Sequence, residues 1–311
     1  MREIGGYIEL ERFSGPLLHE GASALNCGRA ALLLLIRARK IKRLLLPRLL
    51  CDCVSLACER AGIPFTLYGV GADFLPAEDF TLRDGEWLYL VNYYSQLSNP
   101  VLGELVKKHR RVIVDNAHSY FQPPLPGVDT LYTCRKYFGV ADGAFLYTDA
   151  PLPPLERDES HGRMGYLLGR FERSASAFYA EYKANDAFFD HEPPKAMSPL
   201  TENLLRAVDY EAVKQRRREN FRFLHERLGA SNALRLQETG TYMYPYYAEN
   251  GAALRRALQK EGIYIPTLWP AVFDLCKKGE REYKLAENVL PLPIDQRYGP
   301  EEMEALVSRL T

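Results

Sequence analysis

One stretch of the sequence, residues 112–148, constrains the fold more than any other. In it, an apolar strand pattern ends on Asp115, and His118 follows three residues later. A second strand pattern, residues 130–133, is closely followed by Lys136, and a glycine-bearing turn then leads into a third. The stretch therefore predicts three short strands, with a carboxylate at the end of one and an amine at the end of the next.

A carboxylate and an amine at the ends of neighbouring buried strands are what the cofactor pyridoxal 5'-phosphate (PLP) requires. The amine of Lys136 would form a Schiff base with the aldehyde of PLP. The carboxylate of Asp115 would keep the pyridine nitrogen protonated, so that the ring can accept electrons. Each residue alone has an ordinary explanation, because aspartates often cap strand ends and most lysines are solvated. The combination points to a PLP site.

A phosphate-binding pattern precedes this pair in the chain. Gly28 and Arg29 begin the first helix pattern, where free N–H groups can bind phosphate and a guanidinium can add a charged fork. An ordinary turn followed by a surface arginine is the alternative. Thr133 adds a hydroxyl near Lys136. A helix-start phosphate site, a strand-end carboxylate and a strand-end lysine, in this order, favour one PLP-binding domain.

Strand and helix patterns alternate up to residue 148. Their spacing requires right-handed crossovers, which favours an α/β fold with a mostly parallel central sheet flanked by helices. The predicted strands are residues 43–47, 63–68, 87–93, 112–115, 130–133 and 144–147, and the predicted helices are residues 28–41, 51–61 and 99–109.

The pattern changes after residue 148. The later elements are predicted as helices over residues 162–187, 199–228 and 251–261, strands over residues 241–247, 263–266 and 289–293, and a final helix from Pro300. We therefore expect an N-terminal arm and a large PLP-binding α/β domain over residues 1–195, followed by a smaller α+β domain over residues 196–311.

The charge balance and the apolar runs argue against several classes of protein. Forty basic and forty acidic residues give a net charge of zero, so nothing attracts nucleic acid or an anionic membrane over long range. The longest apolar run, residues 30–36, is too short to span a bilayer, and no signal peptide opens the chain. The six cysteines lack the spacing of a zinc site and are expected as reduced thiols. We therefore expect a cytoplasmic protein.

Six matches to motifs of one known family occur in that family's order, the sixth of which combines three C-terminal segments. Residues 26–32 are similar to its Ser-Gly-Thr-Ala-Ala-Leu phosphate turn, residues 94–96 to its Tyr-Gly-Gln, and residues 114–118 to its Glu-Asp-Ala-Ala-His. Lys136 and the glycines after it resemble the Schiff-base lysine and its turn. The remaining similarities are Met197-Ser198-Pro199-Leu200 and the C-terminal segments 262–270, 290–293 and 300–302. Together these segments resemble the DegT/StrS family of sugar aminotransferases, within the fold-type-I group of PLP enzymes.

The resemblance implies a function and a set of site residues. The protein would transfer an amino group from glutamate to a nucleotide-linked keto-sugar, in polysaccharide or secondary-metabolite biosynthesis. Lys136 would hold PLP and then move a proton, Asp115 would pair with the pyridinium nitrogen, and His118 would lie near the ring or its phenolic oxygen. Gly28, Arg29 and Thr133 would bind the phosphate. A homodimer is also implied, with the active site at the subunit interface.

Several positions depart from the family pattern. Arg29 stands where a threonine is usual, and Cys51 or its neighbour Leu50 stands where an aromatic residue covers the cofactor ring. An apolar side chain there would still cover the ring face. The family's Asn-Tyr-Arg is replaced by Pro194-Lys195-Ala196, so the residue contributed by the partner subunit is unassigned.

Other functions remain open. A PLP lyase, racemase or dehydratase acting on a smaller substrate would use the same lysine. A catalytically silent or regulatory protein with the PLP fold is a second alternative, suggested by the altered phosphate turn. An NAD-binding Rossmann protein is disfavoured, because no Gly-x-Gly-x-x-Gly motif follows a strand.

Overall fold

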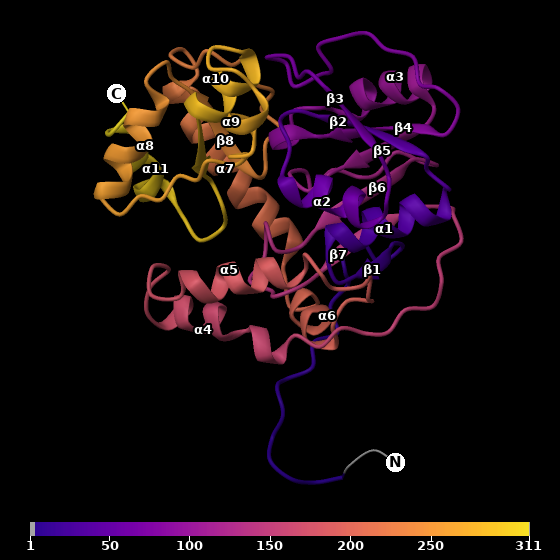
Figure 1. Cartoon of the computed structure of the whole chain (residues 1–311). Coiled ribbons are helices and arrows are strands. Elements are labelled where there is room, and N and C mark those ends of the chain that lie inside the picture. The colour runs from indigo at the N-terminus through magenta and orange to yellow at the C-terminus, as the bar shows by residue number, and fades with distance from the viewer. Residues whose placement is uncertain (1–3, 311) are drawn as a thin grey trace.

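The computed structural model describes residues 4–310 and contains a seven-stranded sheet and a two-stranded sheet (Figure 1). The large sheet has the order β1-β7-β6-β5-β4-β2-β3. Its strands are β1 (Ser23–Leu25), β2 (Arg43–Pro47), β3 (Phe65–Tyr68), β4 (Glu86–Val91), β5 (Val112–Asp115), β6 (Asp129–Thr133) and β7 (Ala144–Tyr147). Among the described residues, β7 alone runs against the other strands of this sheet. The prediction of a mostly parallel sheet is confirmed.

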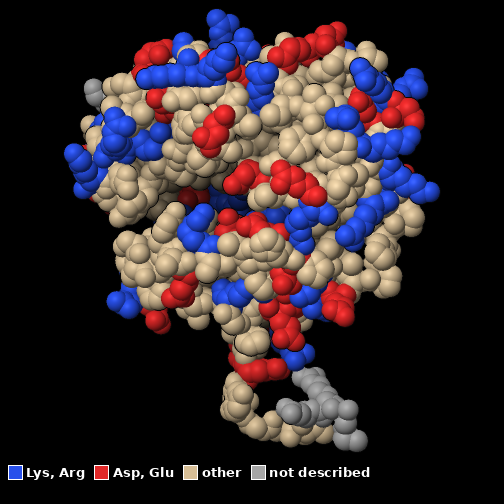
Figure 2. Space-filling model, in the orientation of Figure 1, with Lys and Arg blue, Asp and Glu red and all other residues tan. Residues whose placement is uncertain are grey.

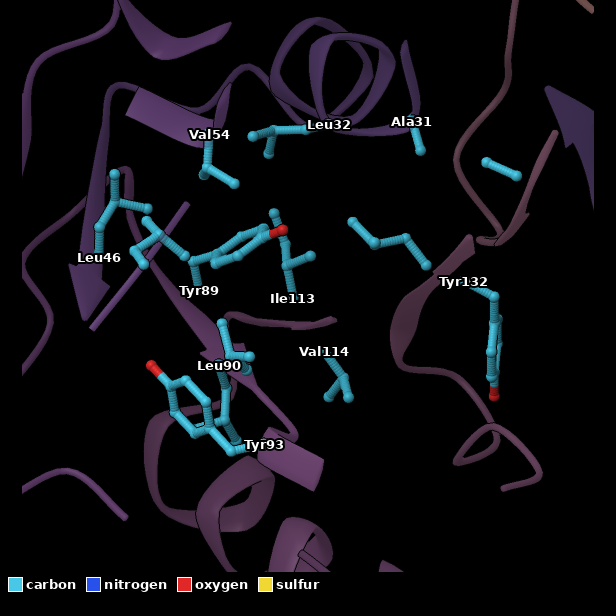
Figure 3. Close-up of a cluster of buried hydrophobic side chains, with 14 of the residues drawn as sticks. Ala31, Leu32, Leu46, Val54, Tyr89, Leu90, Tyr93, Ile113, Val114 and Tyr132 are labelled. Carbon is cyan, nitrogen blue, oxygen red and sulfur yellow. The ribbon is translucent and has the colours of Figure 1, made fainter. Parts of the chain in front are cut away.

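Helices cover this sheet because the strands are apolar on both faces. The helices that alternate with its strands are α1 (Gly28–Ala38), α2 (Asp52–Arg60) and α3 (Asn99–His109). Helix α1 is buried from Ala30 to Ile36, which explains its unbroken apolar run. Figure 3 shows Leu32 of α1 and Val54 of α2 on the same side of the sheet as Tyr89 and Ile113. The sheet core thereby holds the ends of β4, β5 and β6 in fixed positions.

The second half of the chain is mainly helical around the two-stranded sheet. Its elements are α4 (Gly165–Glu172), α5 (Tyr179–Phe188), α6 (Pro199–Leu205), α7 (Tyr210–Leu228), β8 (Met243–Tyr247), α8 (Gly251–Lys260), α9 (Val272–Leu275), α10 (Arg281–Asn288), β9 (Val289–Pro293) and α11 (Pro300–Val307). Strands β8 and β9 pair antiparallel, and α7, α8 and α11 pack around a separate apolar core. We propose that the small domain begins near Ala196, just after the backbone bond from Asn26 N to Lys195 O at 2.9 Å.

Three predicted elements differ in the structure. The predicted helix 162–187 is two helices, α4 and α5, and the predicted helix 199–228 is α6 and α7. The second break occurs because the Asp209 side chain caps a new helix by accepting from Ala212 N at 2.9 Å. The predicted strand 263–266 is wrong: Ile263 N donates back to Leu258 O at 2.9 Å, closing the end of α8, and Pro266 has no N–H to give to a ladder.

The first three residues of the predicted N-terminal arm lie outside the described residues. From Ile4 the arm extends away from the rest of the molecule (Figure 1). It is anchored where Phe13 N donates to Asn203 Oδ1 at 2.9 Å. Within residues 4–310, no helix combines the length and the apolar character that crossing a membrane requires.

Candidate active site

Asp115 is the last residue of β5 and is buried. Its Oδ2 accepts a hydrogen bond from the Tyr89 hydroxyl at 2.8 Å, and its Oδ1 accepts from Ala117 N at 2.8 Å. Burial raises the pKa of Asp115, whereas the positive charge of Lys136 and these two donors act in the opposite direction. The carboxylate is thus held in place on β4 and β5 and is electrostatically coupled to Lys136.

Lys136 lies in the turn after β6, and its side chain is exposed. Its Nζ lies 5.5 Å from the centre of the Tyr242 ring, a residue just before β8. The largest effect on the pKa is the Cys53 thiol for Cys51 and burial for His118 and Asp115, and the charge of the Lys136 amine acts to lower all three. The structure therefore brings together the predicted lysine, carboxylate, histidine and cysteine at one edge of the sheet.

His118 is buried within an aromatic stack. Its ring centroid lies 4.1 Å from that of Tyr242 and 5.9 Å from that of Trp269, and both pairs are close to parallel. Burial, and then the charge of Lys136, lower the pKa of His118 well below its usual value. Tyr94 N donates to Nδ1 at 3.4 Å, so the neutral ring carries its proton on Nε2. The site thus contains a neutral histidine that can donate one hydrogen bond.

A strained loop after β4 holds this histidine. Tyr94 and Ser95 have φ values of 53° and 62°, in the left-handed region that side chains rarely adopt. The Ser95 hydroxyl donates to His118 O at 2.5 Å, and the Thr239 hydroxyl donates to Ser95 O at 2.9 Å. The loop therefore connects the sheet to the segment that carries Tyr242. Strain of this kind is concentrated at functional sites.

The start of α1 forms a cradle beside β6. A Cβ added to Gly28 would lie 3.0 Å from Thr133 Cγ2, so the helix start and the end of β6 are in close contact. The Thr133 hydroxyl oxygen is buried and has no hydrogen-bond partner within the described part of the chain. A buried hydroxyl without a partner is costly, and it would be satisfied by an anion bound at this helix start.

Arg29 is placed differently from a free phosphate ligand. Its guanidinium forms ion pairs with Asp186 of α5 (3.2 Å) and with Asp190 just beyond it. Arg135, which precedes Lys136, also donates to Asp186 at 2.9 Å. The sequence patterns did not identify Arg135 or these carboxylates, because α5 lies about 50 positions further along the chain and its approach depends on the tertiary fold.

Cys51 is the residue before the first turn of α2 and is half-buried. The Cys53 thiol, and then its backbone N–H and the charge of Lys136, lower the pKa of Cys51 despite the opposing effect of burial. A small polarisable thiol under the influence of the Lys136 charge therefore occupies the position where the resemblance implies an aromatic residue. Tyr89, Tyr242 and Trp269 were missed as site residues, since nothing in their local sequence distinguishes them from ordinary core aromatics.

The surface of the protein is hollowed near the candidate site. Figure 2 shows a hollow between α5 and the C-terminal part of the chain, with side chains of both charges around its opening.

The buried histidines predict a pH dependence of stability. Burial lowers the pKa of His19 to about 4, and it lowers that of His118 as well. Below pH about 6.5 these histidines bind protons in the unfolded chain but remain neutral in the folded protein. The free energy of unfolding should therefore fall by about 1.4 kcal/mol for each histidine per unit decrease in pH. Urea unfolding between pH 7 and 5 measures this slope. His19→Phe should reduce it, whereas a variant of the exposed His161, His161→Gln, should not. An unchanged slope in His19→Phe would contradict the prediction.

No family model matches the sequence, and no curated protein matches it either. Solved structures do match. The sugar aminotransferase CalS13 from Micromonospora echinospora has 16% identity and a TM-score of 0.62, over 96% of this chain and 92% of that one. The PMP form of Spr1654 from Streptococcus pneumoniae has 15% identity and a TM-score of 0.65, over 96% and 90% of the two chains.

A third structure carries the family's own name. The DegT DnrJ EryC1 StrS aminotransferase from Brucella abortus has 13% identity and a TM-score of 0.61, over 96% of this chain and 90% of that one. Identities this low establish the architecture, and the mostly parallel seven-stranded sheet agrees with it. The chain has the fold-type-I architecture of the DegT/StrS sugar aminotransferases.

Proposed function

We propose that this protein is a PLP-dependent aminotransferase that transfers an amino group from glutamate to a nucleotide-linked keto-sugar. The reaction would belong to polysaccharide or secondary-metabolite biosynthesis. The observation that carries the proposal is that Lys136, in the turn after β6, and His118 both lie against the Tyr242 ring, with Asp115 at the carboxyl end of the neighbouring strand β5. This arrangement occurs in a fold shared with sugar aminotransferases.

The residues present suit PLP. The unpartnered Thr133 hydroxyl and the N–H groups at Gly28 would hold its phosphate, and Asp115, fixed by Tyr89, would face its ring nitrogen. Cys51 would lie along the ring. When bound, PLP supplies an electron-withdrawing ring that makes the hydrogen on the substrate carbon beside the nitrogen acidic.

Each residue then has a definable task. Lys136 Nζ would take the proton from that substrate carbon and later return a proton, as a general base and acid. Asp115, as the anion, would keep a proton on the nitrogen it faces. His118 would donate a hydrogen bond from Nε2, and the Tyr242 and Trp269 rings would exclude water from one wall of the site.

The choice of a sugar substrate is supported by the neighbours. CalS13 is named a sugar aminotransferase, and Spr1654 has been solved in both PLP and PMP forms, the two forms expected of a transaminase cofactor. We extend these properties to this chain as part of the proposal.

The test is an absorbance spectrum of the wild-type protein loaded with PLP. We expect a visible band that survives desalting and disappears when glutamate is added, with the release of one 2-oxoglutarate per bound PLP. Alanine or another amino acid in place of glutamate would identify a different donor. A band that survives every amino donor would favour lyase or racemase chemistry.

A catalytically silent or regulatory role is the second candidate. It is favoured by the ion pairs that occupy Arg29, the charged residue of the predicted phosphate turn. This candidate predicts that PLP is lost on desalting and that glutamate has no effect on the spectrum.

We also propose that the protein is a cytoplasmic homodimer. Large apolar side chains are exposed on the N-terminal arm and on α4, and a second copy would cover them: Ile4, Tyr7, Ile8, Leu168 and Phe171. Light scattering of the purified protein would measure the subunit number.

A further inference from the structure

Two arginines at the start of α1 and the end of β6 share one acidic partner. Arg29 Nη2 and Arg135 Nη2 both donate to Asp186 Oδ1, at 3.2 Å and 2.9 Å. Arg29 Nη1 also donates to Asp186 O and to the Asp190 carboxylate. We call Asp186, in α5, and Asp190, two residues after its end, the α5 carboxylates. The two arginines pair with no other carboxylate within residues 4–310.

Both arginines lie next to the residues that form the cradle at the start of α1. Arg29 follows Gly28 directly, and Arg135 stands two residues after Thr133. The Arg29 side chain is 9% exposed and that of Arg135 is 19% exposed. Burying two guanidinium groups so close together is unfavourable unless anions compensate them. The α5 carboxylates provide that compensation in the structure.

The compensating anions come from α5 and the segment just after it, which also contact the cradle through other groups. Asn185 Nδ2 donates to Ala141 O at 2.9 Å, and Phe189 is buried against Cys27 and Ala30 at the start of α1. Arg60 donates to the carbonyl oxygens of residues 190–192. The Asp186 and Asp190 side chains are 39% and 33% exposed, so water reaches them more easily than it reaches the arginines. An anion that enters the cradle can therefore compete for the same guanidinium N–H groups.

We propose that Arg29 and Arg135 form a binding subsite for a phosphate group and that the α5 carboxylates fill this subsite until the phosphate arrives. A phosphate dianion offers three acceptor oxygens to the two guanidinium forks, and the N–H groups of α1 and the Thr133 hydroxyl add further donors. A carboxylate offers only two oxygens and one charge. Phosphate binding thus releases α5 from its ion pairs.

The inference rests on the proposed function for the identity of the ligand. The chemistry is that of a phosphate group, which is carried by PLP and also by the diphosphate of a nucleotide-linked sugar. Inorganic phosphate tests the subsite itself, while PLP, pyridoxal without its phosphate, and uridine diphosphate distinguish the two sources.

The first experiment is calorimetric titration of the full chain with inorganic phosphate at constant ionic strength. Asp190→Asn removes one competing charge and should bind phosphate about threefold to tenfold more tightly than the wild type. Arg135→Gln should bind it at least about threefold more weakly. Glu181→Gln is the matched control, because Glu181 is an exposed acid of α5 that does not contact either arginine, and its affinity should stay that of the wild type.

The second experiment needs no variant. Amide hydrogen exchange of residues 179–190 in the wild type should become faster when phosphate binds, because α5 loses its ion pairs. Slower or unchanged exchange would overturn the proposal, as would an Asp190→Asn protein whose affinity for phosphate is unchanged or lower. In those cases the α5 carboxylates serve only to hold the hairpin of α4 and α5.

The outcomes separate the subsite from the proposed function. Binding of inorganic phosphate needs neither the Lys136 amine nor a sugar. A protein that shows no visible band with PLP, but whose Asp190→Asn variant binds phosphate more tightly, would refute the aminotransferase and retain the subsite. If the gain appears with PLP and not with pyridoxal, the phosphate is that of the cofactor; if it appears with uridine diphosphate alone, it is that of the substrate.

Discussion

Lys136→Ala is expected to abolish the visible absorbance band of the PLP-loaded protein and to lower the rate of amino transfer by about 10²-fold to 10⁴-fold or more. The reason is that this amine is the one side chain of the site able both to bind the cofactor aldehyde and to move a proton at the substrate carbon. Its neighbours cannot replace it, since His118 is buried and its pKa is held well below the usual value by burial and by Lys136 itself. Single-turnover spectra with glutamate measure the loss.

Lys136→Arg is the control for charge. Arginine keeps the positive charge that acts on Asp115 but stays protonated, so it cannot act as a nucleophile or a base. Both variants should therefore lose the band and the reaction, while the circular dichroism spectrum stays that of the wild type. A band that persists in Lys136→Ala would show that another lysine binds the cofactor, and the assignment of Lys136 would be wrong.

Arg217→Ala is expected to lower the free energy of unfolding by about 3 kcal/mol or more. Arg217, in α7, is 1% exposed, and its guanidinium donates to the carbonyl oxygens of Thr241 (2.8 Å) and Tyr137 (3.2 Å) and to Gln296 Oε1 (2.9 Å). It also stacks on the Tyr137 ring at 4.5 Å. Truncation would leave buried carbonyls without donors and create a cavity.

The position of Arg217 also connects stability to the site. Its partners include Tyr242 and Tyr137, which directly follows Lys136, so the variant should loosen Lys136 and Tyr242 and weaken PLP retention. The adjacent Arg216 is the matched control, because its side chain is 44% exposed and its contact with Glu219 is 3.6 Å long. Arg216→Ala should change the free energy of unfolding by less than about 0.5 kcal/mol. Urea denaturation of the two variants compares them, and equal losses would contradict the role given to Arg217.

Local patterns were sufficient where one segment determines its own structure. The predicted strands 43–47 and 144–147 and the predicted helix 99–109 agree with β2, β7 and α3 to the residue. In each case the apolar pattern or the helix start is contained in a few consecutive residues. The predicted single helix 199–228 failed because helical periodicity on both sides of residues 206–209 concealed the cap at Asp209.

The proposed site residues likewise include some that local sequence patterns predict and others that depend on the tertiary structure. The sequence predicted Asp115, His118 and Lys136 as site residues, because parallel strands bring their carboxyl ends to one edge of a sheet. It also predicted Gly28 and Thr133, since a helix start and a hydroxyl have recognisable chemistry. The order and the types of these residues were enough to predict a PLP site in an α/β domain.

Only the tertiary structure decided which side chains surround these predicted site residues. The Tyr89 hydroxyl meets Asp115 through the register of β4 and β5, and Tyr242 reaches Lys136 from more than a hundred residues away. The pairing of Arg29 with Asp186 depends on the approach of α5, which no local pattern reports. The sequence by itself determined the chemistry of the proposed site, because the reactive groups belong to single residues at strand and helix ends. The tertiary structure decided which charges are neutralised, because ion pairs and stacking depend on the packing of segments that are distant in the chain.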